Sequence, residues 1–112
     1  MKKATIFAEG VLRAEVIAAD SFFLRLRGLI GRNVEEVTGL LLTPCSQIHT
    51  FFMRSAIDVV YLDRDNRVLR VDEAVKPGKC CRPQRGGCSV LELAPGLAKE
   101  FGIAEGKSIS IR

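Results

Sequence analysis

Hydrophobic and β-branched residues occur in short runs along this chain, and glycine or proline separates most of the runs. The first two runs, residues 4–8 and 11–18, flank Glu9-Gly10, which predicts two strands joined by a tight turn. A third run, residues 39–42, stops before Pro44, whose ring disfavours a helical residue ahead of it. The pattern therefore predicts a hairpin followed by a short buried strand.

Two other stretches have the spacing of a helix. Asp20-Ser21 offers an N-cap, and the apolar stripe that follows it ends at Gly28 and Gly31. The stripe consists of Phe22, Phe23, Leu26, Leu29 and Ile30. Near the C-terminus, Pro95 is tolerated in a first helical turn and Gly102 closes the segment. We therefore expect two short helices.

The second half of the chain is rich in β-forming residues. Residues 48–53 and 57–63 are mostly β-branched or aromatic, so each is predicted to form a strand. The polar turn formers at 63–67 lead into residues 68–71, which predicts a second hairpin. Two more strands are expected at 89–93 and 108–111. The fold class is therefore mainly β with two short helices.

The composition fits one soluble domain. The 112 residues suffice for one core but not two, and the hydrophobic (47%) and charged (27%) fractions are ordinary for a globular protein. No repeat or linker divides the chain, so we expect residues 1–112 to form a single domain. Glu9 and Arg13 interrupt any export signal, and no stretch reaches the length of a membrane span. We expect a cytoplasmic protein.

The net charge of +4 is unevenly distributed. Between residues 76 and 87, Lys76, Lys79, Arg82 and Arg85 occur without any acidic residue, together with prolines and glycines. Such a segment has few apolar atoms to bury, so we expect a mobile, solvated loop beside His49, with binding of an anionic partner as the alternative. Nucleic acid is an unlikely partner, because the loop lacks aromatic residues and no nucleic-acid motif accompanies it.

Four cysteines and one histidine are the residues with the most distinctive chemistry. In a protein that is not exported, Cys45, Cys80, Cys81 and Cys88 should remain thiols or bind metal rather than form disulfides. Thiolate and imidazole ligands suit tetrahedral zinc, so a zinc or thiol redox site could combine Cys45 and His49 with one or two of Cys80, Cys81 and Cys88. The alternative is a set of free loop thiols, because no C-x2-C pair is present.

Cys45 and His49 could also form a nucleophile and base pair, depending on the backbone. In an extended segment their side chains lie about 13 Å apart at roughly 3.3 Å per residue, whereas in a helical turn they meet. A strand over 48–53 would place His49, Phe51 and Met53 on one face. We then expect a largely buried His49 with a hydrogen bond, and core positions for Phe51 and Met53.

Two acidic residues stand in apolar surroundings. Asp58 begins a predicted strand, and an ion pair with Arg54 across the preceding bend is the expected way to satisfy its charge. Glu92 has Val90 and Ala94 on its own face of another strand. A catalytic carboxylate pair is conceivable, although nothing in the spacing requires one.

The segments Ile48 to Arg54 and Ile57 to Asp63 resemble the bacterial and archaeal family known as domain of unknown function 192. The resemblance extends to Phe23 to Leu29, Gly39 to Leu42, Val90 to Leu93 with Gly96, and Gly102-Ile103 with Gly106. It implies a compact, mostly β, barrel-like domain and no particular activity. Cys45 and His49 resemble one branch of the family, whereas the cluster of Cys80, Cys81 and Cys88 is not part of the resemblance.

No nucleotide-binding loop, Ser-His-Asp order or zinc-protease signature is present. We therefore expect a small binding or assembly domain without catalytic residues, with a cleft near Cys45, His49 and Met53 and a protein or small molecule as its ligand. The candidate ligand-binding residues are Cys45, His49, Arg54, Asp58, Arg82 and Arg85. The alternatives are the zinc or thiol redox site and, less favoured, an enzyme that uses Cys45 and His49.

Overall fold

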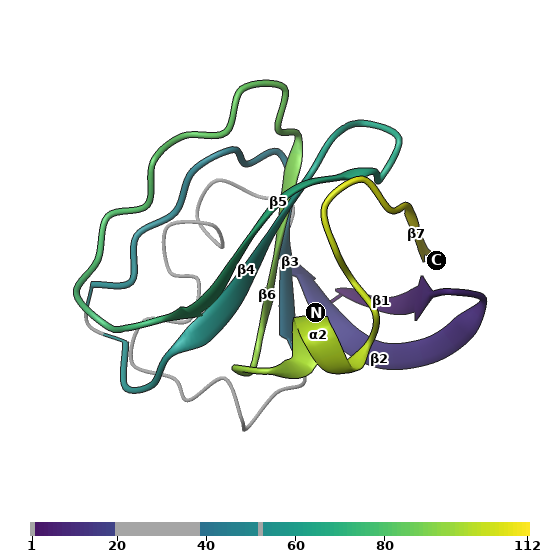
Figure 1. Cartoon of the computed structure of the whole chain (residues 1–112), viewed down its shortest axis with the longest axis horizontal. Coiled ribbons are helices and arrows are strands. Elements are labelled where there is room, and N and C mark those ends of the chain that lie inside the picture. The colour runs from purple at the N-terminus through teal and green to yellow at the C-terminus, as the bar shows by residue number, and fades with distance from the viewer. Residues whose placement is uncertain (1, 20–38, 52) are drawn as a thin grey trace.

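The computed structural model describes residues 2–19, 39–51 and 53–112, and within them seven strands form one curled sheet (Figure 1). The strands are β1 (Lys2–Ala8), β2 (Val11–Ala19), β3 (Gly39–Leu42), β4 (Ile57–Leu62), β5 (Val68–Val75), β6 (Ser89–Leu93) and β7 (Ile109–Ile111). Their order across the sheet is β5-β4-β6-β3-β2-β1-β7. All neighbours are antiparallel except β2 and β3, which run parallel.

The two outer strands of the sheet approach each other at one corner. Arg67 and Ser108 form an isolated antiparallel bridge beside β5 and β7. The backbone N–H of Val68 donates to the carbonyl of Lys107 at 2.8 Å, which fixes this contact. The curled sheet is therefore a half-barrel, as expected of a mainly β, barrel-like domain.

The turn residues explain both hairpins. Glu9 and Gly10 have φ angles of 54° and 73°, the left-handed conformation that a tight two-residue connection between twisted strands requires. In the turn between β4 and β5, the carboxylate of Asp63 accepts backbone N–H groups from Asp65 at 2.8 Å and Arg67 at 2.9 Å. Both predicted hairpins are confirmed, and β5 extends four residues beyond its expected end at Val71.

One short helix, α2 (Leu97–Glu100), lies among the described residues and packs against β4. It occupies the place that the proline and glycine pattern predicted. The other expected helix, over residues 21–31, lies outside the described residues. None of the helical segments in the described part of the chain has the length and hydrophobicity of a membrane-spanning helix.

The start of α2 is held by Asp58, which is fully buried in β4. Its carboxylate accepts the backbone N–H groups of Gly96 at 3.0 Å, Ala98 at 3.1 Å and Ala74 at 2.9 Å. The predicted ion pair between Asp58 and Arg54 is therefore wrong, because backbone donors satisfy the carboxylate. A negative charge at this position also interacts favourably with the N-terminal end of the helix.

Apolar side chains cover both faces of the central strands β3, β4 and β6. One face forms the helix-side core, which includes Leu41, Val60, Leu91 and Ala98. The opposite face forms the loop-side core, made of Ala19, Leu40, Leu42, Ile48, Met53, Ile57, Val59, Tyr61, Cys81 and Val90. Because both faces are buried, these strands read as continuous apolar runs instead of alternating ones.

The expected strand over residues 48–53 is not formed among the residues that the structure describes there. His49 makes only an isolated bridge with Cys80, and Thr50 is tied to the loop that follows β5. The Thr50 hydroxyl donates to the carbonyl of Lys76 at 2.7 Å and accepts the N–H of Lys79 at 2.8 Å. The β-branched composition therefore supports packing between two loops rather than a place in the sheet.

Met53 lies in the loop-side core with 8% of its surface exposed, as expected from the sequence. Replacing it by alanine should lower the free energy of unfolding by about 2 to 5 kcal/mol, through lost burial and a residual cavity. Urea unfolding of Met53→Ala measures this change, with the exposed Leu12→Ala as the control. Equal midpoints for Met53→Ala and the unmodified protein would contradict a core role for Met53.

Candidate functional site

Two loops that are distant in sequence lie side by side and form the most distinctive part of the surface. We call residues 43–56 and 76–88 the paired loops. Their backbones are joined by Thr50 N to Lys79 O (2.7 Å), Gly78 N to Thr50 O (2.8 Å), Cys81 N to Ile48 O (3.1 Å), Gln84 N to Ser46 O (2.8 Å) and Cys45 N to Cys88 O (3.0 Å). The expected position of the second loop beside His49 is therefore confirmed.

The paired loops bring together all four cysteines and the single histidine. Cys45 lies across from Cys88, and His49 lies across from Cys80. Residues 45–49 contain no helical turn, so Cys45 and His49 are not neighbours on one helical face. The fold therefore favours a pairing of His49 with Cys80 that sequence spacing did not reveal.

His49 is exposed, not buried as expected. Its ring stacks on Phe51 with centroids 4.7 Å apart and an interplanar angle of 24°, and its Nδ1 accepts the Phe51 backbone N–H at 3.3 Å. Phe51 is itself 40% exposed, so the prediction of a core Phe51 is also wrong. Both errors have one cause, because the segment forms a loop and does not lie flat against the sheet.

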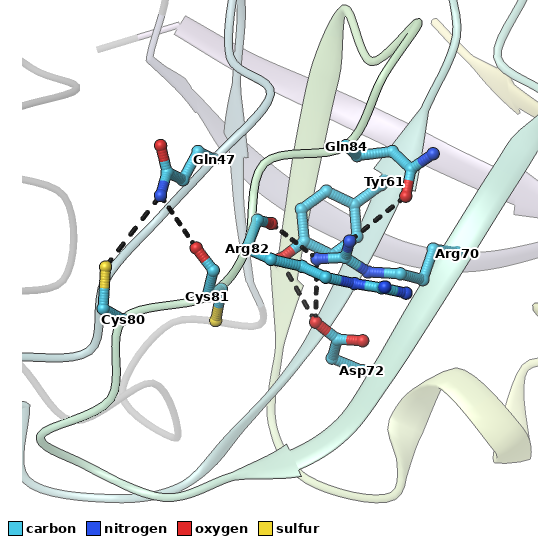
Figure 2. A network of polar contacts seen from close by, with 8 residues as sticks. All are labelled: Gln47, Tyr61, Arg70, Asp72, Cys80, Cys81, Arg82 and Gln84. Carbon is cyan, nitrogen blue, oxygen red and sulfur yellow. Dashed lines mark hydrogen bonds and ion pairs between the residues drawn. The ribbon is translucent and has the colours of Figure 1, made fainter.

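The four thiols have different surroundings. Cys45 Sγ donates to the Gln47 carbonyl at 3.2 Å, and Cys88 Sγ donates to the Gly86 carbonyl at 3.8 Å. Cys81 is buried, and burial raises the pKa of its thiol. Cys80 is exposed, and its sulfur accepts an N–H from the Gln47 side chain at 3.9 Å (Figure 2). Each thiol is therefore in a distinct chemical environment.

None of the four cysteines forms a disulfide in the structure. Within residues 2–19, 39–51 and 53–112, no group of three or more His, Cys, Asp or Glu side chains is arranged to hold a metal ion. Zinc binding by Cys45, His49, Cys80, Cys81 and Cys88 therefore stays an untested prediction. A structural zinc site ordinarily needs four such ligands around one centre.

A buried arginine joins the sheet to the second of the paired loops (Figure 2). Arg70 is 8% exposed, and its guanidinium lies 3.8 Å from the centroid of the Tyr61 ring. Its Nη2 donates to the Asp72 carboxylate at 3.0 Å and to the Arg82 carbonyl at 2.9 Å, and its Nη1 donates to Gln84 Oε1 at 3.1 Å. One side chain in β5 thus fixes the loop at two positions.

Sequence reasoning did not identify this network, although a signal was present. Arg70 and Asp72 are two residues apart on β5 and therefore share one face of the strand. Tyr61 is the cross-strand partner of Arg70 in β4, and its hydroxyl contacts Asp72 at 3.3 Å. A basic and an acidic residue at this spacing in an apolar strand indicate a buried pair.

Burial also affects the polar groups around Arg70. It raises the pKa of Tyr61 well above its usual value of 10.0, and the neighbouring Cys81 thiol adds to the effect. Tyr61 and Cys81 are therefore both neutral near pH 7. Arg70 Nε is buried without a hydrogen-bond partner among the described residues. Among the described residues, Asp72 is the acidic residue that pairs with Arg70.

Glu92 is the other buried charged residue of interest. It lies in β6 on the loop-side face, between Leu40 and Val59 on the neighbouring strands, with 3% of its surface exposed. Its Oε2 has no hydrogen-bond partner among the described residues, and burial raises its pKa to about 8. Asp58 points to the opposite face of the sheet, so the conceivable carboxylate pair is not formed.

Five exposed basic residues belong to the paired loops, and we call them the basic surface. They are Arg54, Lys76, Lys79, Arg82 and Arg85. Neither loop contains an aspartate or a glutamate. Of the candidate ligand-binding residues, Cys45, His49, Arg54, Arg82 and Arg85 therefore lie in one region, whereas Asp58 is buried beneath α2.

Comparison with known proteins places the whole chain in one group. The family DUF192, described as an uncharacterized ACR, matches residues 4–111. A UPF0127 protein of Thermococcus kodakarensis is 34% identical over 86% of this chain, and the match spans 64% of that protein's length. A UPF0127 protein of Pyrococcus furiosus is 30% identical over 85% of this chain and 84% of its own length.

Two solved structures share the fold. A Sinorhizobium meliloti protein superposes with a TM-score of 0.81 and 18% identity, covering 96% of this chain and 91% of its own. A protein of unknown function from Novosphingobium aromaticivorans superposes with a TM-score of 0.77 and 20% identity, covering 96% of this chain and 83% of its own. At these identities the likeness concerns the fold alone.

Glu92 should make folding stability depend on pH. The folded pKa of about 8 lies above the ordinary value of 4.5, so the folded protein keeps a proton that the unfolded chain releases. Stability should be retained below about pH 4.5, fall as pH rises, and level off above about pH 8. Glu92→Gln should remove this fall, which amounts to several kcal/mol at about 1.4 per pKa unit.

Chemical denaturation at pH 5 and pH 8 measures the effect as a difference between the two proteins. Exposed Glu100→Gln serves as the control, because its charge is already solvated. A Glu92→Gln variant that loses as much stability between the two pH values as the unmodified protein would contradict a buried, protonated Glu92.

Arg70 should determine how firmly the second paired loop is held. In Arg70→Met, the hydrogen bonds to Arg82 and Gln84 are lost, so the backbone amides of Cys81 and Gln84 should exchange faster with solvent. Hydrogen exchange measured by NMR tests this, with the surface variant Lys3→Met as the control. Equal acceleration throughout β1 and β2 would indicate general destabilisation instead.

The same experiment on the unmodified protein tests loop mobility. The amides of Cys81 and Gln84 donate to backbone carbonyls, and the amide of Lys79 donates to the Thr50 hydroxyl. We therefore expect all three amides to be protected, rather than the mobile loop that the composition suggested. Rapid exchange at all three positions would instead support the mobile loop that the composition predicts.

Proposed function

Because the chain belongs to the DUF192 family, for which no activity is established, we propose that it is a non-catalytic binding domain whose basic surface holds an acidic segment of a partner protein. The observation that carries the proposal is the concentration of charge on the paired loops. Arg54 comes from the first loop and the other four basic residues come from the second. Backbone hydrogen bonds hold the two loops together.

The charge balance supports an anionic partner. The five basic residues of the paired loops exceed the net charge of the whole chain, which is +4. The remainder of the molecule is therefore close to neutral, and its positive potential originates in this region. Such a potential raises the rate at which an acidic partner associates and favours it over a neutral one.

The loops are also held in place before any partner binds. Arg70 fixes the second loop to β5, and Thr50 fixes the first loop to the second through its hydroxyl and its backbone. Because these loops do not have to be ordered during association, less conformational entropy is lost on binding. The paired loops therefore offer a preorganised surface for recognition, and recognition by such a surface requires no catalytic group.

A protein segment fits this surface better than a nucleic acid does. Sites for single-stranded nucleic acid combine basic grooves with successive aromatic platforms for the bases. In the described part of the paired loops, Phe51 is the exposed aromatic residue, and its ring is stacked with His49. The Sinorhizobium meliloti protein is described as a candidate transcription regulator, and with 18% identity it supports a common fold and no common ligand.

The stacked pair of His49 and Phe51 gives the surface one apolar anchor. An exposed aromatic side chain beside charged groups is typical of the residues that contribute most to protein recognition. We therefore expect the partner segment to carry an apolar side chain among its acidic ones. Phe51→Ala should weaken binding of such a segment more than binding of a purely acidic one.

A labelled polyglutamate peptide is a suitable probe of the basic surface. Binding is measured by fluorescence anisotropy for the unmodified protein and for a double variant, Lys79→Glu with Arg82→Glu. The double variant should bind about tenfold more weakly or worse, since each exposed charge pair contributes up to roughly 1 kcal/mol and reversal makes it repulsive. Added salt should weaken binding to the unmodified protein.

The matched control reverses two exposed charges elsewhere, Arg64→Glu with Lys99→Glu, and changes the net charge by the same amount. If the control variant weakens binding equally, net charge and not the paired loops determines affinity, and the proposal is wrong. Tighter binding of a single-stranded oligonucleotide than of the peptide would also overturn it, in favour of a nucleic-acid partner.

A further inference from the structure

We propose that Cys80, with His49 and Gln47 beside it, is a site of covalent modification by thiol–disulfide exchange. The co-reactant is a small disulfide that carries carboxylates, of the class of oxidised glutathione. This inference goes beyond the binding function and does not depend on it, because it concerns the chemistry of one sulfur atom. The sequence had pointed to Cys45 as the thiol partner of His49.

The backbone geometry places the two side chains together. Thr50 N donates to Lys79 O at 2.7 Å and Cys81 N donates to Ile48 O at 3.1 Å, on either side of the bridge between His49 and Cys80. Directly opposite residues between two such bonds form a non-hydrogen-bonded antiparallel pair, with Cα atoms about 4.5 Å apart and side chains on the same side. Both residues are exposed.

The sulfur of Cys80 accepts one hydrogen bond, and the imidazole of His49 belongs to the residue directly opposite. The Gln47 amide directs one N–H to Cys80 Sγ at 3.9 Å and the other to the Cys81 carbonyl at 2.9 Å, which fixes its orientation (Figure 2). His49 Nδ1 accepts the Phe51 N–H, so the neutral ring carries its hydrogen on Nε2. The Gln47 N–H in contact with the sulfur is the kind of donor that can assist the attacking sulfur.

The thiols of the other three cysteines are less suited to attack a disulfide. Cys45 and Cys88 are only partly exposed, and each donates its S–H to a backbone carbonyl. Cys81 is buried, so a disulfide cannot approach it without local opening. Cys80 is thus the exposed thiol whose sulfur accepts a hydrogen bond among the described residues.

In the exchange, the Cys80 thiolate attacks one sulfur of the disulfide, and the sulfur–sulfur bond of the disulfide breaks. A new bond joins Cys80 Sγ to one half of the co-reactant, and the other half leaves as a thiolate. The proton that Cys80 gave up ends on the released thiolate. The Cys80 sulfur is oxidised and the released half is reduced, so the disulfide itself is the oxidant.

The basic surface selects the charge of the co-reactant. Lys79 and Arg82 are close to Cys80 in sequence, both are exposed, and the opposite loop contains no acidic residue. A disulfide with carboxylates is attracted to this region, whereas a disulfide with ammonium groups is repelled. The modification would also place negative charge on the basic surface.

The test compares two small disulfides, oxidised glutathione and the dicationic cystamine, on the reduced full-length chain. Mass spectrometry follows the mixed disulfide and locates the modified cysteine. Cys80 should react first, and Cys80→Ser should lose the fast phase, whereas Cys45→Ser and Cys88→Ser should keep it. Oxidised glutathione should react faster relative to cystamine at low salt than at high salt.

His49→Gln and Gln47→Leu separate the roles of the neighbours. Each should slow modification of Cys80 by about tenfold at neutral pH, where the thiolate fraction limits the rate, and by much less at high pH, where the thiol is already ionised. Modification of Cys45 or Cys88 at the rate of Cys80 would overturn the proposal, as would equal rates in both variants and the unmodified protein at neutral pH.

Discussion

The buried guanidinium of Arg70 is the constraint on which the arrangement of the surface depends. It replaces water with the carboxylate of Asp72, two acceptors from the second paired loop and the face of the Tyr61 ring. A charge that has left water is costly, so the acceptors must stay in place once it is buried. The loop is therefore held by the requirement to solvate an arginine, because its own side chains bury little apolar surface.

The two cores have different roles, because one stabilises the sheet and the other supports the paired loops. The helix-side core contains residues from all seven strands and from α2. Asp58 in β4 holds the helix and β5 through three backbone donors. The loop-side core lies beneath the paired loops, and the buried side chains of Ile48 and Met53 anchor the first loop to it. The basic residues and the exposed thiol of Cys80 lie on the outer side of these loops, where substitutions disturb the core least.

Much of the fold could be predicted because local chemistry decides it. The turn at Glu9-Gly10, the run at 39–42 and the closure of α2 by Gly102 are local signals, and each element formed where expected. The site was harder to predict, because it depends on which distant backbones pair. No spacing in the sequence shows that Cys80 lies opposite His49, and a β-branched composition at 48–53 does not distinguish a sheet strand from a loop bonded to another loop.

The meeting of β5 and β7 at one corner also bears on how the protein behaves at high concentration. Open sheet edges present unpaired N–H and C=O groups to which a strand of another molecule can add. Here β7 has only three residues, β5 is interrupted by Ala74 with a φ of 50°, and the bridge between Arg67 and Ser108 occupies part of each edge. The half-barrel thus offers a second molecule little regular backbone to extend, and this protects a strand-rich chain from aggregating edge to edge.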